Sequence, residues 1–363
     1  MPEKTITVAV VTEKTGAHLG AYFEALRETE ECEAVVVCDP SGTHFEAAKK
    51  TLGDKLSAVF KSTDAMLTNA KPGMALVSME GADSPPVVDK LLDAGVHVLA
   101  EKPACTNLAD FENLVRKAEA GNLRLMLALA NRITPAVQKA KSLVAEGLLG
   151  DLYGASIHMV ADQTRLRSES YHSSWYADRS RAGGGILMWL GIHWLDLAAL
   201  ISGEAISDVA GFTGIVGGQP LTVEDSAAMA IRFGNGAHGT MNAGYYTDKG
   251  YHSFIKLWGS GGWLEYQEHL GDRTSMPLKW YSNKDPKAGI VEYDGPMEPK
   301  GYTPYVRRCV QACAGLTEAP ITGAEGLSVL RTIFRFYEAA DKGIAASLDG
   351  PRNAARADPP NER

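Results

Sequence analysis

The sequence predicts an α/β protein of two domains: a doubly wound parallel sheet, followed by an α/β domain with a large, mainly antiparallel open sheet. Three observations support this. The chain has 363 residues, more than one average core holds. Strand and helix patterns alternate in its first third, and longer runs of alternating hydrophobicity follow from about residue 130. We expect domains at 1–128 and 129–350, and a loose tail at 351–363.

The first third contains short β-branched runs separated by amphipathic stretches. The predicted strands are residues 5–11, 34–38, 74–79, 96–100 and 124–129. The predicted helices are residues 17–28, 44–52, 86–94 and 108–120. Strict alternation of strand and helix predicts right-handed βαβ units and therefore a Rossmann-type parallel sheet.

The pattern changes after residue 130. A helix over 136–146 and a glycine-rich corner at 147–150 precede the predicted strands 152–160, 208–214, 227–233, 239–245, 253–258 and 262–266. Short glycine-rich turns, such as residues 233–236 and 258–262, favour hairpins between neighbouring strands. Helices over 305–314 and 325–339 are expected to complete the second domain.

Composition narrows the class of protein. The formal net charge is −8 and no Lys/Arg-dense tract occurs, which argues against a nucleic acid or an anionic membrane as partner. No uninterrupted apolar run reaches the roughly 18 residues of a membrane span, and no signal-peptide pattern opens the chain, so we expect a cytoplasmic protein. Five cysteines without C-x-x-C spacing are interpreted as reduced thiols, with no metal site.

The strand at 96–100 ends at Glu101, Lys102 and Pro103. Ligands of open parallel sheets bind beyond the carboxyl ends of the strands, so Lys102 is predicted at the rim of a binding crevice. Pro103 fixes its own φ and restricts Lys102, which stiffens this turn. The alternative is an ordinary solvated lysine at a strand end.

Several motifs occur in a fixed order along the chain. They are Glu101-Lys102-Pro103, Asn131-Arg132 with Pro135, the 147–150 corner, Trp175-x-x-Asp178, the run 183–196, Glu224-Asp225, 259–262 and 322–326. Together they resemble the Gfo/Idh/MocA family, which comprises NAD(P)-dependent sugar and inositol dehydrogenases and their relatives. The resemblance implies a nucleotide-binding Rossmann domain, an open sheet that often builds oligomer contacts, and therefore a homodimer or homotetramer.

His193 is the main catalytic candidate. The run after the glycines is predicted to be helical, so Trp189, His193 and Asp196 would share one face. An imidazole titrates near neutral pH, as a base for a sugar hydroxyl requires. The resemblance implies that His193 and Lys102 handle the proton of the substrate alcohol, with Lys102 supplying charge where alkoxide develops. The alternative is a hydrogen-bonded core histidine.

Two departures from the family affect the chemistry. Trp189 stands where the family usually has an aspartate, and an indole cannot relay a proton, so the base would rely on Lys102, water or Asp196. Trp189 is otherwise interpreted as a stacking platform for a sugar ring or as core. The segment 78–83 also lacks the family's usual proline and histidine. Both suggest altered chemistry on a retained fold.

The predicted cofactor loop is poor in glycine. Only Gly16 remains in the turn after the first strand, and Glu13 there would repel a pyrophosphate. Asp39 at the end of the second strand is predicted to accept from the adenosine ribose, which favours NAD over NADP; the alternative is a turn aspartate. The predicted cofactor-binding residues are Thr12, Lys14, Gly16, Asp39, Ser78, Glu101, Lys102 and Asn131.

The segment 164–181 is rich in aromatic, arginine and histidine side chains, which suit a polyol or sugar, while its arginines would admit a carboxylate or phosphate. The predicted substrate-binding residues are Lys102, Arg132, His158, Tyr171, His172, Trp175, Asp178, Trp189 and His193.

Three functions follow as hypotheses. The first is an NAD-linked oxidoreductase acting on a hydroxyl or keto carbon of a sugar, inositol or related polyol. The second is a redox-neutral relative that retains NAD, such as a glycosidase, lyase or epimerase on a keto-sugar. The third is a catalytically silent sugar-binding relative, suggested by the same departures.

Overall fold

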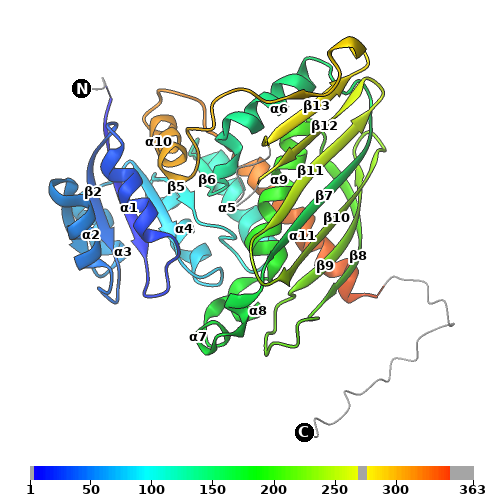
Figure 1. Cartoon of the computed structure of the whole chain (residues 1–363). Helices are drawn as coiled ribbons and strands as arrows, with labels where there is room; N and C mark the ends of the chain where they lie inside the picture. The colour runs from blue at the N-terminus through cyan, green and yellow to red at the C-terminus, as the bar shows by residue number, and fades with distance from the viewer. Residues whose placement is uncertain (1–3, 269–275, 344–363) are drawn as a thin grey trace, which may run out of the picture.

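The computed structural model describes residues 4–268 and 276–343, which form two sheets joined by helices (Figure 1). The first sheet has six parallel strands in the order β3-β2-β1-β4-β5-β6. Their bounds are β1 Ile6–Thr12, β2 Cys32–Cys38, β3 Leu56–Phe60, β4 Met74–Ser78, β5 His97–Ala100 and β6 Leu125–Leu127. The strand order reverses between β1 and β4, and this switch point is where doubly wound sheets bind ligands.

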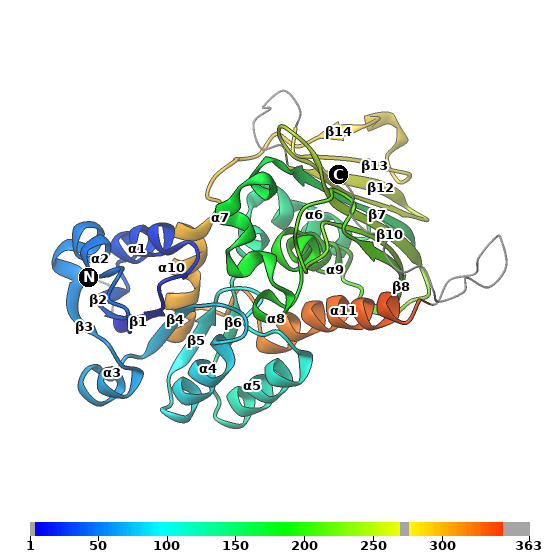
Figure 2. The same ribbon diagram turned by 90° about the horizontal axis from the view of Figure 1, so that it is seen from below.

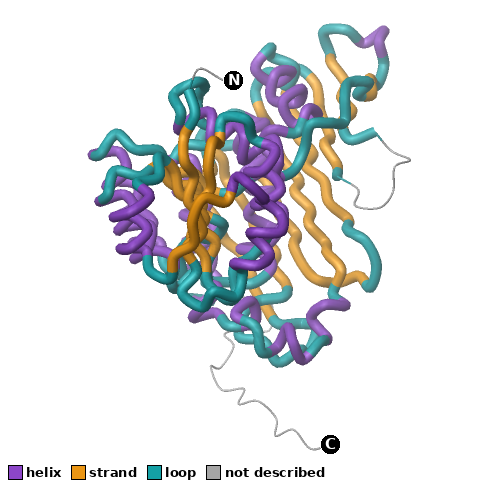
Figure 3. The backbone as a smooth tube through the Cα atoms, turned by 90° about the vertical axis from the view of Figure 1, so that its left-hand side faces the viewer, coloured by secondary structure: helices purple, strands orange, loops and turns teal. Residues whose placement is uncertain are grey.

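Helices cover both faces of this sheet (Figure 3). They are α1 Leu19–Glu28, α2 Phe45–Leu52, α3 Thr63–Ala70, α4 Ser84–Asp93 and α5 Leu108–Ala120. The late helix α10 (Tyr302–Cys313) packs beside α1, so a segment distant in sequence completes the first layer (Figures 1 and 2). The central strands β1 and β4 are almost wholly buried, as expected for strands with both faces covered.

The second sheet has eight strands in the order β14-β13-β12-β11-β7-β10-β9-β8. Their bounds are β7 Leu152–Asp162, β8 Ile206–Gly214, β9 Ser226–Phe233, β10 His238–Thr247, β11 His252–Gly259, β12 Gly262–Gln267, β13 Leu278–Ser282 and β14 Val291–Glu292. Only the β7–β10 pair is parallel. The predicted mainly antiparallel sheet is therefore confirmed.

Three helices pack on one face of the second sheet: α6 Pro135–Ala145, α9 Ile192–Ser202 and α11 Gly323–Asp341 (Figure 1). The opposite face exposes large side chains such as Tyr153, Phe212 and Trp258. The short helices α7 Glu169–His172 and α8 Arg179–Ala182 lie near the edge that faces the first sheet (Figure 2).

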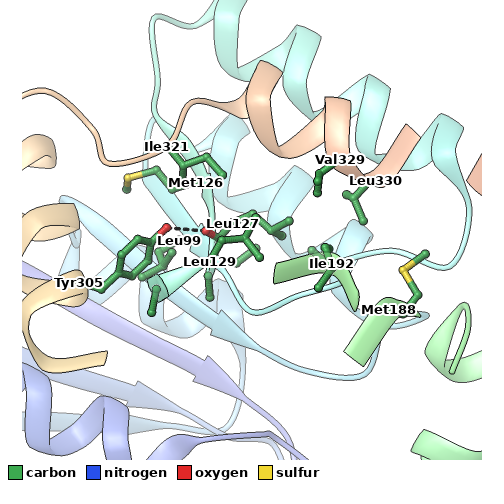
Figure 4. Packing of buried hydrophobic residues seen from close by; sticks show 14 of the residues in the cluster. Leu99, Met126, Leu127, Leu129, Met188, Ile192, Tyr305, Ile321, Val329 and Leu330 are labelled. Atoms are coloured by element: carbon green, nitrogen blue, oxygen red, sulfur yellow. Dashed lines mark hydrogen bonds between the residues drawn. The ribbon is translucent and has the colours of Figure 1, made fainter. Parts of the chain in front are cut away.

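A shared apolar cluster connects the two sheets (Figure 4). Leu127 of β6, Ile192 of α9 and Leu330 of α11 are all buried in it. Tyr305 of α10 donates a 2.6 Å hydrogen bond from its hydroxyl to the carbonyl oxygen of Leu127. Because one buried cluster ties β6, α9, α10 and α11 together, the first sheet is held in a fixed position against the second domain.

The predicted elements are found with shifted ends, and six strands and α-helices of the described residues were not predicted: β3, α3, β13, β14 and the short helices α7 and α8. β3 and β13 lie at or near the sheet edges, and most of their side chains are partly buried or exposed. They therefore lack a continuous apolar run. α3 buries only Met66, which leaves almost no amphipathic pattern. The predicted strand 124–129 is shorter, because residues after Leu127 turn into a 3₁₀ helix at Ala130–Ile133. The predicted tail at 351–363 lies outside the described residues.

The helical stretch Arg179–Ser202 is long and apolar enough, by length and composition, to cross a membrane. The expectation that no such segment occurs was therefore too strict, since it considered only uninterrupted apolar runs. In the folded protein 78% of its most apolar window is buried, the pattern of a central core helix.

Candidate active site

Lys102 lies at the carboxyl end of β5, as predicted, but it is buried rather than at an open rim. Only 2% of the residue is exposed. Its ammonium nitrogen donates a 3.0 Å hydrogen bond to the backbone carbonyl of Trp189 and lies 3.7 Å from the centroid of the Trp189 ring. This contact brings the first sheet against the segment that precedes α9.

Trp189 belongs to a π-helical segment, Leu187–Gly191, which continues directly into α9. Such segments insert extra backbone into a helix and are frequent at functional sites. The side chains that were predicted to share one face have different partners. Trp189 contacts Lys102, whereas Asp196 binds the Arg132 guanidinium through both carboxylate oxygens, at 2.6 and 2.8 Å. Asp196 is therefore not the partner of His193.

His193 begins the second turn of this helical run and is half-buried. Its Nδ1 and the Trp189 Nε1 are buried without a hydrogen-bond partner in the described segments 4–268 and 276–343. Unpartnered buried polar atoms are costly, so a ligand that bonds to them gains accordingly. Burial and the nearby Lys102 charge lower the pKa of His193 to about 3.

Burial lowers the pKa of Lys102 to about 8, although the neighbouring Glu101 carboxylate favours the charged ammonium. Lys102, which follows β5, and His193 of α9 thus have widely separated pKa values. Lys102 titrates near working pH, whereas His193 stays neutral there. Proton transfer is most efficient for a group whose pKa lies near the operating pH, which favours Lys102 as the proton-transferring group.

Glu101 is buried and fully engaged. One oxygen accepts from the Tyr22 hydroxyl and from His18 Nδ1 at 3.1 Å, and the other accepts from the Lys102 backbone N–H at 3.1 Å. Burial alone would raise the pKa of Glu101, but the hydrogen bond from His18 and the Lys102 charge lower it overall. Tyr302 of α10 contacts His18, so α10 helps to hold this acid in place.

An aromatic wall faces Lys102 and consists of Trp175, Tyr176 and Trp189. Their ring centroids lie 4.4 to 5.1 Å apart. Tyr171 stacks on Tyr176 at 6.3 Å. Of the predicted substrate residues, Lys102, Tyr171, Trp175, Trp189 and His193 therefore come together, and Tyr176 joins them although it was not in the predicted set.

Four other predicted substrate residues have structural partners elsewhere. His158 lies on the opposite face of the second sheet from α9, stacked on Phe254 at 5.1 Å, so its prediction was wrong. Asp178 caps α8 by accepting from the Ser180 backbone N–H at 2.9 Å. His172 Nε2 lies 2.5 Å from the Leu166 carbonyl.

Arg132 is the fourth, and it pairs with Glu325 at 2.8 Å as well as with Asp196. Cavities of about 310 and 690 Å³ flank this Arg132–Glu325 pair. Neither is lined by Lys102 or His193.

The loop between β1 and α1 is held by polar contacts in place of glycines. Glu80 connects three segments: its backbone N–H donates to Glu13 at 2.6 Å, its carboxylate accepts from Thr15 at 2.8 Å, and Arg181 binds it with two nitrogens at 2.5 and 2.7 Å. Trp175 Nε1 also donates to the Thr15 carbonyl at 3.3 Å. The loop is thus fastened to the segment 175–182 of the second domain.

Three predicted cofactor residues support this loop from within. Thr12 is buried and donates to the Ser78 carbonyl at 2.8 Å, while the Ser78 hydroxyl donates to the Ala17 carbonyl at 2.7 Å. A Cβ on Gly16 would collide with the Thr12 hydroxyl and lie 2.8 Å from the Ser78 carbonyl oxygen. Gly16 thus permits the close approach of loop and strand ends on which dinucleotide sites depend.

Asp39 ends β2 as predicted and is completely buried. Its carboxylate accepts from the Ser41 backbone N–H at 2.9 Å and hydroxyl at 2.7 Å, and from the His44 backbone N–H at 3.0 Å. Burial alone would raise the pKa of Asp39, but these bonds lower it. These hydrogen bonds are those of an aspartate that stabilises its own turn, which was the alternative interpretation of Asp39. His44 in turn reaches the carbonyls of Glu13 and Lys14, at 3.1 and 3.3 Å.

Sequence reasoning missed Tyr22, Glu80 and Arg181, which position the site from a distance. Nothing in their local patterns distinguishes them from ordinary helix and loop residues. Asn131 lies in the 3₁₀ helix after β6, where its backbone carbonyl accepts from the Thr134 N–H at 3.1 Å. No group of three or more His, Cys, Asp or Glu side chains arranged to hold a metal ion occurs among residues 4–268 and 276–343. All five cysteines are unpaired in the structure.

Comparison with known proteins identifies the family of this chain. Residues 54–129 match the model of an oxidoreductase family with an NAD-binding Rossmann fold, and residues 137–265 match the GFO/IDH/MocA C-terminal domain. The chain is 24% identical over 286 residues to the trans-1,2-dihydrobenzene-1,2-diol dehydrogenase of Mus musculus, covering 76% of this chain and 78% of that one. It is 23% identical to the D-apiose dehydrogenase of Paraburkholderia graminis, covering 76% of each.

Some other alignments are shorter. In two of them this chain spans only about half the length of the curated relative, 50% and 42%. Among solved structures, the WlbA dehydrogenase of Bordetella pertussis in complex with NADH and UDP-GlcNAcA superimposes with a TM-score of 0.77 at 20% identity, over 94% of this chain and 98% of that one. This likeness confirms the fold.

The two family models describe consecutive parts of one architecture and follow each other along the chain in the expected order. The chain therefore belongs to the Gfo/Idh/MocA family of oxidoreductases, with an NAD-binding Rossmann fold in its N-terminal part.

Proposed function

We propose that the protein is an NAD-dependent dehydrogenase that oxidises a hydroxyl group of a sugar, inositol or related polyol. The observation that carries this proposal is the meeting of Lys102 from β5 with Trp189 and His193 from the second domain. The proton-transferring lysine lies against the aromatic wall, and the neutral imidazole lies close enough for the Lys102 charge to act on it. Aromatic faces suit sugar rings, and polar tips orient their hydroxyls.

NAD fits the first sheet at the β1–β4 switch point. The crowded Gly16 position allows the chain to approach closely there, and the strand order is that of dinucleotide-binding domains. Bound NAD would supply the acceptor for a hydride from the carbinol carbon. The Asp39 carboxylate and the absence of a basic residue at 40–43 favour NAD over NADP, because a 2′-phosphate would meet negative charge.

The net reaction converts the alcohol and NAD⁺ into the carbonyl compound, NADH and a proton. In this proposal the neutral amine of Lys102 accepts the hydroxyl proton as the C–H hydride leaves, and in the reverse direction the ammonium returns it. His193 stays neutral and hydrogen-bonds the same hydroxyl or its neighbour. Trp189 holds the ammonium against its ring face and carbonyl. General acid–base catalysis of this kind contributes about 10²- to 10⁴-fold to rate.

Activity on a panel of sugars and polyols, followed as NADH absorbance, tests the proposal. Lys102→Met should lower kcat by about 10²-fold or more, because it removes the proton acceptor. Lys90→Met is the matched control, since Lys90 is exposed and pairs with Asp64 on the surface. Full turnover by Lys102→Met would end the assignment.

A second candidate is the redox-neutral, NAD-retaining chemistry. The fastening of the 13–18 loop by Trp175 and Arg181 favours it, because these contacts would have to open before a bound dinucleotide could exchange. Mass analysis of the nucleotide released on denaturing the purified protein distinguishes the two. Stoichiometric NAD that survives dialysis, with no net NADH formed from any substrate, would support retention over dehydrogenation.

A further inference from the structure

Arg165 brings a second positive charge to the aromatic wall. Its guanidinium carbon lies 4.7 Å from the centroid of the Tyr245 ring, and one nitrogen donates to the Tyr245 hydroxyl. Tyr245 is buried in β10, so it fixes where the guanidinium can lie. The Arg165 charge also contributes to lowering the pKa of Lys102, after the larger effect of burial. Arg165 therefore lies close enough to Lys102 for their charges to interact.

The guanidinium of Arg165 has no carboxylate within ion-pair distance in the described parts of the chain, residues 4–268 and 276–343. Asp162, the nearest acid along its own segment, instead accepts from the Thr164 backbone N–H and hydroxyl at 2.7 and 2.6 Å. By contrast, Arg167 two residues later binds Asp248 at 2.8 Å. A guanidinium offers five N–H donors, and the Tyr245 hydroxyl takes one.

Lys102 likewise has more hydrogen-bond donors than bonded partners. An ammonium has three donors, and one bonds to the Trp189 carbonyl. The nearby acids are already engaged: Glu101 by Tyr22 and His18, and Glu224 by the Tyr337 hydroxyl at 2.7 Å. Arg165 and Lys102 thus keep hydrogen-bond donors that a carboxylate would accept with charge assistance, whereas a neutral group would not.

We propose that the substrate carries a carboxylate, and that Arg165, held by Tyr245, binds this carboxylate while Lys102 and His193 act on a hydroxyl of the same molecule. The substrate class is thus a sugar acid or polyhydroxy acid rather than a neutral sugar. This inference rests on the proposed function for the identity of the site, but it concerns binding and can be measured without turnover.

The test compares acids with their neutral parents: D-glucuronate with D-glucose, D-galacturonate with D-galactose, and D-gluconate with sorbitol. Calorimetric titration of the wild-type protein, with and without saturating NADH, gives each Kd. At least one acid should bind about 10- to 100-fold more tightly than its neutral parent, because a charge-assisted hydrogen bond contributes about 1.5–3 kcal/mol. Arg165→Gln should reduce that preference to about twofold or less.

Arg167→Gln is the matched control, because it removes a neighbouring charge that is already paired with Asp248 at the surface. It should leave the preference unchanged, and Tyr245→Phe should weaken it partially by releasing the guanidinium. Equal binding of acids and parents by the wild-type protein, no binding of any acid, or an equal loss in the Arg167→Gln variant would each overturn the inference.

The two proposals fail differently. Binding of an acid that depends on Arg165, without NADH formation from any substrate, would keep the carboxylate site and reject the dehydrogenase function. NADH formation from neutral sugars, with no preference for acids, would do the reverse.

Discussion

The Lys102 ammonium lies 3.7 Å from the centre of the Trp189 ring and 3.0 Å from the Trp189 carbonyl oxygen. The residue that replaces the family's usual aspartate therefore still contacts the lysine, but through a ring face and a carbonyl dipole instead of a full negative charge. Burial is consequently offset only by Glu101, and the lysine pKa falls to about 8. This pair determines how the site should respond to pH and substitution.

The pH dependence of alcohol oxidation should follow Lys102. Because the neutral amine accepts the proton, log(kcat/KM) should rise with pH up to about 8 and then level off. No inflection near pH 6.5 is expected from His193, whose pKa is about 3. Steady-state rates between pH 5.5 and 10 check this, and a profile that falls above pH 8 in the oxidation direction would contradict the role of Lys102 as base.

Substitution of Trp189 should shift the pH of that inflection, downward or upward according to the side chain that replaces the indole. Trp189→Leu removes the cation–π contact, worth about 0.5–2 kcal/mol, so the Lys102 pKa should fall by about 0.4 to 1.5 units. Trp189→Asp places a carboxylate there and should raise it, while Trp189→Phe should change it little. The pH profiles of the three variants test this order, and identical inflections in all three would show that Trp189 does not act on Lys102.

Lys102 should also destabilise the fold in a pH-dependent way. Its pKa is about 8 in the folded protein and 10.5 unfolded, so the unfolded chain binds more protons between these values and stability rises with pH there. Below pH 8 the cost is about 3 kcal/mol. The free energy of unfolding of Lys102→Met minus wild type should therefore shrink from pH 8 to 10.5. Denaturant titrations measure it, with Lys90→Met as control.

Glu13 should weaken the binding of NAD. It lies half-buried beside Glu80 in the loop that would face the pyrophosphate. Glu13→Gln removes one repulsive charge of about 1 kcal/mol and should tighten NAD binding about fivefold. Glu24→Gln, on the exposed face of α1, changes net charge equally and should have no effect. Fluorescence titration with NAD measures the Kd of each variant. Equal NAD affinities of the two variants would show that the dinucleotide does not bind beside Glu13.

Gly16 should be required for the stability of the loop between β1 and α1 and for the binding of NAD there. Gly16→Ala would press a methyl against the Thr12 hydroxyl and the Ser78 carbonyl, at a cost of about 1–3 kcal/mol in stability and with weaker NAD binding. Gly20→Ala has open space and lies inside α1, so it should stabilise by about 0.5–1 kcal/mol. Thermal unfolding of the pair checks both signs, and a Gly16→Ala protein as stable as wild type would contradict the crowding.

Much of this protein could be predicted from local sequence. Alternating strand and helix patterns predicted the parallel sheet, because periodicity follows directly from which side chains must be buried. The abrupt end of β5 placed Lys102 at the carboxyl edge of the first sheet. The elements that escaped prediction, β3, α3, β13, β14, α7 and α8, bury few side chains and therefore carry little periodic signal.

The candidate site was predicted only in part. Helical spacing alone grouped Trp189, His193 and Asp196, but their tertiary contacts differ: Trp189 lies against Lys102, and Asp196 pairs with Arg132. His158 alternates to the outer face of its strand, which depends on how the sheet is covered. Glu80, Arg181 and Arg165 acquire their roles through contacts with segments far away in the chain.

The sequence by itself determined the order of the elements and the family, and it predicted Lys102 and His193 as reacting groups, because these inferences depend on local patterns and residue chemistry. Only the tertiary structure decided that Lys102 is buried under Trp189, that its pKa falls while His193 stays neutral, and that Arg165 brings a second cation to the same wall. Burial and the distances between charges are properties of the packed chain, and they control the protonation of every group in this site.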